Sequence, residues 1–379
     1  MESALFTDWL RLVRSPGMGA ATLIHLVRHL GSFSAVLAAS PKQLATVPNM
    51  RPALSRTLEQ FRLHSPAAPI ADELERLHAM GGRMLIPGEA DYPPLLAAIH
   101  DPPPALFVLG DPALLQGDGP VTVTGTRKAS RSGLEFAFTL GRDLAQSGMV
   151  TVSGLATGID AAAHRGALAN RGATVGVLAT GLNVAYPRSN RELQQNIATH
   201  GCLVTEAPLG VLPVPWLFPP RSRILSGLSR GVVIVEAPEG SGALITARMA
   251  LEQGREVFAV PGLANNANTR GTHELLRQGA RLTEGVNDIL EELNWPVRPP
   301  PEPSEYKKST QEQHPLLGGD AASVLACIGS DPLHEDELAR CCQLTVIALS
   351  RILLQLELSG VVERLPGGRY ARITSRPPP

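Results

Sequence analysis

The feature that most constrains the fold is a regular alternation of short apolar segments and longer helical segments between Pro120 and Leu293. The apolar segments share a β-rich composition and are VTVTGT, MVTVSG, TVGVLAT, CLVTEAP, VVIVEAP, EVFAVPG and RLTEG. This alternation is typical of α/β proteins with a doubly wound, mostly parallel sheet. Most of the segments lack a period of two, as expected for strands that helices cover on both faces.

The chain opens with two predicted helices, Leu5–Val13 and Ala20–Leu30, separated by the break SPGMG. This break has the Pro-Gly-x-Gly pattern of a helix-hairpin-helix turn, in which Gly17 and Gly19 would let backbone N–H groups hold a phosphate. The alternative is that the glycines only close a helix pair, because the second break, Val47–Met50, contains no glycine.

The segments that flank the alternating region differ from it in composition. Residues 80–115 are proline-rich with short apolar runs such as Leu106–Leu109, and we expect an ordered lead-in to the sheet. Beyond a linker rich in Pro, Lys, Gln and Ser, three helical runs and two strand-like runs around a Pro-Gly-Gly turn predict a winged helix. The helical runs are Ala321–Gly329, His334–Cys342 and Thr345–Ser359.

A chain of 379 residues is longer than one typical core, so several domains are expected. No basic leader with an adjoining apolar stretch opens the chain, and no apolar run is long enough to cross a bilayer. We therefore expect a cytoplasmic protein without membrane insertion. The expected domains are a small helical (helix-hairpin-helix or SAM-like) domain at 1–64, the α/β domain at 65–294, a flexible linker at 295–316 and the winged helix at 317–373.

Charge and cysteine content set further limits. The net charge is −1, so any affinity for a polyanion must come from local arginine clusters. Aromatic residues make up only 4% of the chain, so few stacking platforms are expected. The four cysteines show no CxxC pair and no Cys/His zinc spacing, so no metal site is predicted. They are interpreted as reduced core thiols: Cys202, Cys327, Cys341 and Cys342.

Three predicted strands are followed by glycine-rich loops that open helices: Gly125–Lys128, Ser153–Asp160 and Gly240–Thr246. Ligands of open α/β sheets bind at this edge, and glycine loops at helix N-termini suit phosphate. No Gly-Lys-Ser/Thr or GxGxxG pattern occurs in these loops, which disfavours ATP hydrolysis and NAD binding. The alternative is ordinary turn chemistry, although three such loops on one edge favour a binding site.

Arginines gather beside the same loops. Arg127 follows the first strand, and two further stretches, YPRSNR and FPPRSR, each stand beside a strand end and open a helix. A lone arginine is usually a solvated or ion-paired surface residue. Convergence on one edge would instead produce a ring of positive charge, formed by Arg127, Arg188, Arg191, Arg221 and Arg223.

The motifs SGLATGIDAAAHRGAL, GLNVAYPRSNREL, FPPRSRILSGLSRGVVIVEAPEGSGALITA and ALEQGREVFAVPG, in this order, closely resemble the DNA-processing protein A (DprA/Smf) family. The resemblance implies an extended Rossmann-like fold, a homodimer, binding of single-stranded DNA and loading of the RecA recombinase in natural transformation. Single-strand-binding protein is a further candidate partner, and no cofactor is expected. Exposed apolar residues in the last third of the α/β domain are our hypothesis for the dimer surface.

The resemblance implies a DNA pocket made by Gly125, Thr126, Arg127, Ser153, Gly154, Arg188, Arg191, Arg221, Arg223, Ser241, Gly242 and Thr246. The sequence departs from many family members at Thr126 in place of Ser, at Thr157 in place of Arg and at Ser222 in place of Asn. Threonine at position 157 lacks the positive charge of the arginine that many family members have there. We therefore hypothesise that Arg127, Arg188 and Arg223 contribute more to DNA binding here than in relatives.

No catalytic residue is predicted. Asp160 and His164 share a helix face, but we interpret them as an N-terminal cap and a packed side chain. Glu206 and Glu236 stand at strand ends without a nucleophile or metal-ligand set, and would orient arginines. The main alternative function is a nucleotide-processing, phosphoribohydrolase-like enzyme, although the PGGxGT signature is missing. A duplex-binding regulator is disfavoured because the predicted recognition helix, residues 345–356, has few polar side chains that could contact base edges.

Overall fold

The structure is a computed structural model that describes residues 2–15, 19–48, 68–117, 119–169, 172–296, 321, 324–325, 327–328, 333–342 and 344–372. The chain divides into two compact units, residues 1–298 and 299–379. Gly17 and Asn49-Met50 of the two predicted helical breaks, most of the predicted linker and the predicted boundary at residue 64 lie outside the described residues.

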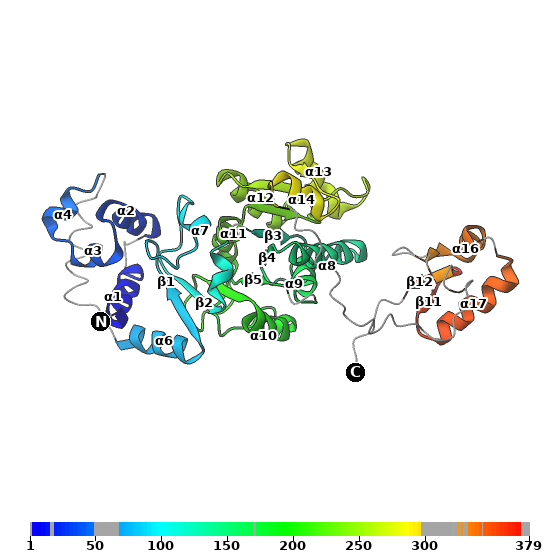
Figure 1. The fold of residues 1–379 in the computed structure, drawn as a ribbon, viewed down its shortest axis with the longest axis horizontal. Helices are drawn as coiled ribbons and strands as arrows, with labels where there is room; N and C mark the ends of the chain where they lie inside the picture. Colours follow the sequence, from blue (N-terminus) through cyan, green and yellow to red (C-terminus); the bar gives the residue numbers. More distant parts are fainter. Residues whose placement is uncertain are drawn as a thin grey trace. The chain divides into compact units, whose positions relative to one another are not determined.

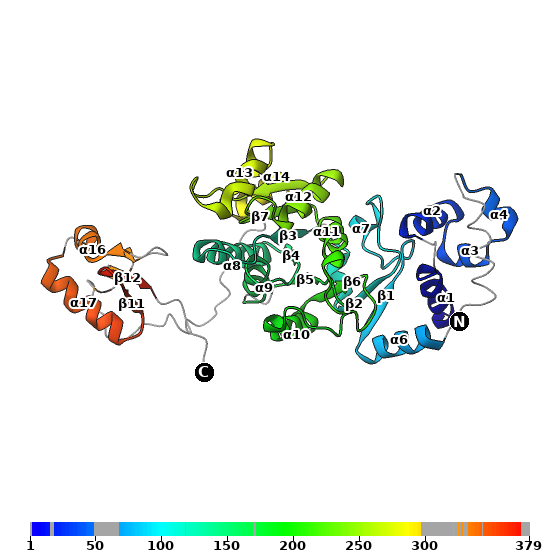
Figure 2. The same ribbon diagram turned by 180° about the vertical axis from the view of Figure 1, so that it is seen from behind.

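The first unit contains one large twisted sheet flanked by helices (Figures 1 and 2). Within the described residues its strand order is β1-β2-β6-β5-β4-β3-β7-β8-β9. All neighbouring strands from β6 to β9 in this order pair in parallel. The strands are β3 (Pro120–Thr124), β4 (Val150–Ser153), β5 (Thr174–Val177), β6 (Cys202–Thr205), β7 (Gly231–Ile234), β8 (Glu256–Ala259) and β9 (Arg281–Leu282). All seven predicted strands and their parallel arrangement are thus confirmed.

Helices cover both faces of the sheet, as the continuous apolar runs predict. Val233 of β7 packs with residues of α8, α9 and α14, whereas its neighbours Val232 and Ile234 pack with residues of α12 and α13. The helices that follow the parallel strands are α8 (Arg131–Gln146), α9 (Ile159–Ala169), α10 (Arg191–His200), α11 (Phe218–Gly227), α12 (Gly242–Glu252), α13 (Arg270–Arg277) and α14 (Val286–Glu292).

The proline-rich lead-in extends the sheet. Strands β1 (Gly82–Leu85) and β2 (Leu106–Gly110) form an antiparallel pair, and β2 also pairs antiparallel with β6. Short helical segments connect these strands to each other and to β3: α7 (Pro94–Ala97) and η1 (Pro112–Leu115). The expected ordered lead-in is therefore an antiparallel edge on an otherwise parallel sheet.

The N-terminal helices pack onto this edge. Trp9 is fully buried, and its ring N–H donates to the carbonyl of Pro104 at 2.7 Å. Its apolar cluster also contains Leu77 of α6 and Phe107 of β2. The helices are α1 (Glu2–Val13), α2 (Ala20–Leu30), α3 (Phe33–Ala38), α4 (Pro41–Ala45) and α6 (Ala68–Ala79). Both predicted N-terminal helices are present.

The second unit has the elements of a winged helix. Its sheet order is β10-β12-β11, one strand more than predicted. Gly367 and Gly368 have φ of +84° and +66°, which fits the predicted Pro-Gly-Gly turn between β11 and β12. The elements are β10 (Leu333–His334), α16 (Glu335–Cys342), α17 (Val346–Leu358), β11 (Val362–Leu365) and β12 (Arg369–Arg372). The first predicted helix lies only partly within the described residues.

Within the described ranges, no single helix has the length and apolar character needed to cross a membrane. One bent pair, Glu335–Cys342 with Ile347–Leu358, passes that test on length and composition alone.

Candidate nucleic-acid interface

The candidate site lies where the direction of the sheet reverses. Strand β3 lies between β4 and β7, so the connections after β3 and after β7 diverge at their carboxyl ends. Open α/β sheets bind ligands at this topological switch point. A cavity of about 390 Å³ occurs here, lined by the loop after β3 and by the first turns of α9, α11 and α12. The predicted residues that line it are Gly125, Thr126, Arg127, Arg221, Ser241, Gly242 and Thr246.

Backbone contacts hold the two diverging loops together. The N–H of Thr126 donates to the carbonyl of Glu236 at 2.7 Å. A Cβ at Gly125 would lie 2.7 Å from that same oxygen, so the close approach requires glycine. The hydroxyl of Ser241 accepts from the N–H of Ala243 at 3.3 Å and caps α12. The cavity is therefore built from fixed backbone rather than from long side chains alone.

Arg221 is held at the cavity by its guanidinium. Its Nη1 donates to the carbonyl of Gly154 at 2.7 Å, while its buried Nε has no hydrogen-bond partner among the described residues. Burial lowers the pKa of Arg221, an effect that the negative charge of Asp160 opposes and the positive charge of Arg127 increases. Arg221 thus presents to the cavity a cation that a backbone carbonyl holds in place.

An aromatic ring contacts both of the arginines that line the cavity. The guanidinium carbons of Arg127 and Arg221 lie 5.3 Å and 5.4 Å from the ring centroid of Phe218. These distances are in the range of cation–π contacts. The ring of Tyr186 meets Phe218 edge-on at 5.8 Å. Sequence reasoning missed both rings, although Phe218 opens the FPPRSR motif and Tyr186 precedes Pro187 in YPRSNR.

A third aromatic residue was also missed. Trp216 in η3 (Pro215–Leu217) is 71% exposed, and its chain neighbour Pro215 lines the cavity. A large ring left in solvent beside a cationic cavity is a surface on which a planar ligand can stack. The signal in the sequence is a tryptophan inside a proline-rich segment, PVPWLFPP, between a strand and the arginine motif.

The remaining predicted residues do not line this cavity. Ser153 is buried, and its hydroxyl donates to the carbonyl of Val123 at 2.6 Å. Gly154 contributes through its carbonyl, which holds Arg221. Arg188 is exposed at the start of η2 (Arg188–Asn190), and Arg191 lines a separate hollow along α10. Of the predicted ring of five arginines, Arg127 and Arg221 are the two that line the cavity together.

Arg223 is engaged in ion pairs instead. Its Nε lies 3.1 Å from Asp101 Oδ2 and its Nη2 lies 2.7 Å from Glu206 Oε2. The Arg223 side chain is only 11% exposed, and Glu206 is the more buried of its two partners, at 28% against 46% for Asp101. The two ion pairs tie α11 to the β6 end of the sheet and to the loop after α7.

We predict that Arg223→Ala lowers the free energy of unfolding by about 2 kcal/mol, because it leaves Glu206 half-buried without its partner. This expected loss of stability is smaller than for a fully buried ion pair, because Asp101 is 46% exposed. Urea unfolding followed by circular dichroism measures the change. Arg277→Ala is the matched control, because Arg277 pairs with Glu274 on the surface and is 70% exposed. Equal losses in the two variants would contradict a structural role for Arg223.

The acidic residues and His164 have structural contacts. Asp160 lies inside the first turn of α9, where it accepts from the Thr124 hydroxyl at 2.8 Å and the Ala156 N–H at 3.3 Å. The predicted N-cap role is thus wrong. His164 is fully buried, and burial lowers its pKa to about 3, as expected for a packed neutral ring. Its Nδ1 lies 2.7 Å from the Thr174 hydroxyl.

The two glutamates differ in what they contact. Glu206 orients an arginine, Arg223, as predicted. Glu236 does not: its carboxylate accepts from the backbone N–H of Ser130 at 2.9 Å and from the Ser130 hydroxyl at 2.5 Å. Glu236 therefore holds the N-terminus of α8. The prediction that Glu236 orients an arginine is wrong, because its carboxylate hydrogen-bonds Ser130 at the N-terminus of α8.

The balance of charge at the cavity is positive. Arg127, Lys128 and Arg221 line it, and Asp160 carries the one carboxylate among the described lining residues. Exposed Arg127 and Lys128 are free to reach a ligand, and the helix N-terminus of α12 adds backbone N–H groups. Fold and site together define a doubly wound α/β protein with a cationic cavity at its switch point, joined to a winged helix.

Comparison with known proteins identifies the family. Residues 83–294 match the family described as DNA recombination-mediator protein A, residues 299–368 match the DprA winged helix domain, and residues 4–57 match the DprA-like N-terminal HHH domain. The chain therefore belongs to the DNA recombination-mediator protein A (DprA/Smf) family. Protein Smf of Escherichia coli is 40% identical over 294 residues, which is 76% of this chain and 77% of that protein.

Two solved structures of relatives resemble this one. The X-ray structure of DNA processing protein A from Streptococcus pneumoniae has 32% sequence identity and a TM-score of 0.65, covering 75% of this chain and 97% of that one. A structure of DNA processing protein A from Helicobacter pylori has 31% identity and a TM-score of 0.51, covering 56% and 95%. The latter is described as giving insight into a single-stranded DNA binding mode.

Proposed function

We propose that this chain is a DNA-processing protein that binds single-stranded DNA at the switch-point cavity. The observation that carries the proposal is a pair of arginines that line the cavity and contact the same Phe218 ring: Arg127 after β3 and Arg221 in the first turn of α11. Guanidinium groups suit phosphate, and aromatic rings suit unstacked bases, which single strands expose and duplexes hide.

The predicted contacts divide into two groups. At the cavity, Arg127 and Arg221 contact phosphate, and backbone N–H groups at the start of α12 add donors. Outside the cavity lining, exposed Arg188 and Arg191 contact the strand beyond the first phosphates. A strand runs past several cations in this arrangement, so the affinity falls steeply with salt.

By family membership we further propose that the protein protects incoming DNA in natural transformation and helps load the RecA recombinase in the cytoplasm. Single-strand-binding protein is a second proposed partner. We propose binding without catalysis, because Asp160, the one carboxylate among the described lining residues, already accepts from the Thr124 hydroxyl and the Ala156 N–H.

A binding comparison tests the proposal. The full chain is titrated with a labelled single strand, the matching duplex and a mononucleotide over a series of salt concentrations, with a nucleotide-hydrolysis assay in parallel. We expect the single strand to bind tightest, with a linear fall of log affinity against log salt. Turnover of the nucleotide would favour the phosphoribohydrolase-like alternative, and tighter duplex binding would favour a duplex-binding regulator.

We predict that Trp216→Ala lowers single-strand affinity by about tenfold, because base–aromatic stacking contributes about 1–3 kcal/mol per base. The slope of affinity against salt stays unchanged, since no cation is removed. Fluorescence anisotropy at several salt concentrations measures both quantities. Trp216→Phe retains a ring and serves as control. If Trp216→Phe lowered single-strand affinity as much as Trp216→Ala does, a stacking role would be contradicted.

We also propose a homodimer formed through the β9 edge of the sheet. Leu251, Leu263 and Leu282 are 57%, 74% and 51% exposed, and Leu282 lies in the edge strand. Edge strands with exposed apolar side chains favour pairing with a second copy.

Leu282→Arg is expected to convert dimers to monomers, as measured by light scattering, because it places a charge on the edge strand. Leu354→Arg is the control, because Leu354 lies in the winged-helix unit and is 57% exposed. A Leu282→Arg variant that remains a dimer would refute this surface.

A further inference from the structure

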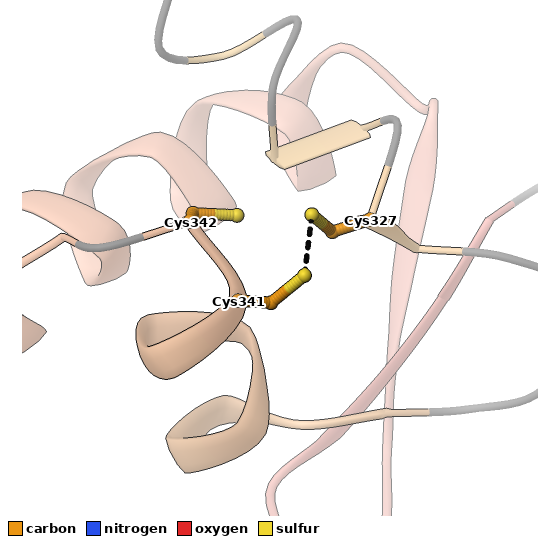
Figure 3. Close-up of side chains that lie close together, drawn as sticks. All are labelled: Cys327, Cys341 and Cys342. Atoms are coloured by element: carbon orange, nitrogen blue, oxygen red, sulfur yellow. Dashed lines mark hydrogen bonds between the residues drawn. The ribbon is translucent and has the colours of Figure 1, made fainter.

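Three of the four cysteines converge in the winged-helix unit. Cys341 and Cys342 end α16, and Cys327 comes from the helical residues that precede β10 (Figure 3). Their three sulfur atoms all lie within 4.8 Å of one another, and Sγ of Cys341 lies 2.8 Å from Sγ of Cys327. The interpretation of all four cysteines as core thiols is therefore wrong for Cys341, which is exposed, while Cys327 and Cys342 are half-buried.

Cys202 provides the contrast. It lies in β6 of the other unit, is fully buried, and burial raises its pKa to about 12. This is the inert core thiol that the sequence predicts. The missed cluster has no CxxC spacing because its members come from two segments that only the fold brings together.

Three thiols are the ligand set of a thiophilic cation. Thiolates bind Zn²⁺ at about 2.3 Å in tetrahedral geometry, which separates neighbouring sulfurs by about 3.8 Å. The three sulfurs lie within 4.8 Å of one another, and the Cys327–Cys341 pair, at 2.8 Å, must open by about 1 Å to reach that separation. A disulfide between Cys327 and Cys341 would instead need a sulfur–sulfur distance of about 2.05 Å and would use only two of the three sulfurs. The convergence of three sulfurs favours the cation.

We propose that Cys327, Cys341 and Cys342 form a Zn²⁺ site in the winged-helix unit, with water in the fourth position. The exposure of Cys341 leaves that position accessible to solvent. On binding, the three thiols release their protons to solvent and the ion cross-links the segment before β10 to the end of α16. Small units gain stability from such a link because their apolar cores are limited.

The test uses the full chain, reduced and stripped with a chelator. Zn²⁺ is titrated in competition with a chromogenic chelator, and Co²⁺ serves as a spectroscopic probe of thiolate ligation. We expect one ion per chain and thiolate-to-cobalt charge-transfer absorption. Cys341→Ser should weaken Zn²⁺ binding by more than the roughly 10- to 100-fold that loss of an outer-shell partner costs. Cys202→Ala is the matched control and should leave affinity and absorption unchanged.

Cys327→Ser repeats the test from the other segment. Because Cys341 is exposed, Cys341→Ser remains decisive even where Cys327→Ser fails to fold. Binding that is absent in the parent chain, or equal in the parent and Cys341→Ser, would overturn the proposal. So would a Cys327–Cys341 disulfide, seen by mass spectrometry without reductant, in a chain that binds no Zn²⁺ after reduction.

Discussion

Replacing Arg127 and Arg221 together by alanine is expected to lower the affinity for single-stranded DNA by about a hundredfold or more, because each charge-assisted hydrogen bond contributes about 1.5–3 kcal/mol. Both guanidinium groups line the cavity and lie against the same ring, Phe218. Each lost phosphate contact also lowers the slope of log affinity against log salt by about 0.7 on a single strand. The double variant should therefore lose about 1.4 from the slope, since two contacts are removed.

The control for charge alone is Arg248→Ala. Arg248 lies on α12 near Thr246, is 67% exposed and does not line the cavity. Its removal lowers the net charge by one, as the loss of either cavity arginine does, but should change affinity little. The single variant Arg127→Ala measures what the exposed arginine contributes to affinity, because Arg221, which also donates to the Gly154 carbonyl, stays in place. Anisotropy titrations in which the double variant binds like Arg248→Ala, with the parent slope, would refute the cavity as the DNA site.

Prediction of the sheet from sequence succeeded because its central strands are buried on both faces. Continuous apolar runs such as VVIVE have few alternatives when helical segments follow each of them. The antiparallel pair β1 and β2 was expected only as an ordered lead-in. These strands are four and five residues long and are separated by a proline-rich loop, so neither length nor period distinguishes them from that loop.

Prediction of the site was partial for a related reason. The loops after β3 and β7 were found because the carboxyl ends of parallel strands meet at one edge. The position of Arg223 depends on Asp101 and Glu206, which are distant in sequence. A short motif such as FPPRSR cannot show which of its arginines faces a ligand and which pairs with an acid. The same limit hid Phe218, whose role depends on arginines from two segments.

The packing beside the cavity depends on how closely α8 and α9 approach, since α9 contributes the lining residue Asp160. A Cβ at Gly166 would lie 1.9 Å from the carbonyl oxygen of Phe138, and one at Gly141 would lie 2.2 Å from that of Ala163. Each helix thus presents a glycine to the backbone of the other. No rotamer change can relieve a contact with a backbone oxygen, so a larger residue must separate the helices.

Gly166→Ala is therefore expected to lower the free energy of unfolding by about 2 kcal/mol. Overpacking costs about 3 kcal/mol where backbone must move, and the gain in helix propensity of about 1 kcal/mol offsets only part of it. Urea unfolding measures the change as a lower midpoint at constant slope. Gly285→Ala is the control, because its Cβ would meet nothing within 4 Å and its φ of −177° suits any residue. Equal midpoints for the two variants would show that the α8–α9 crossing tolerates a side chain.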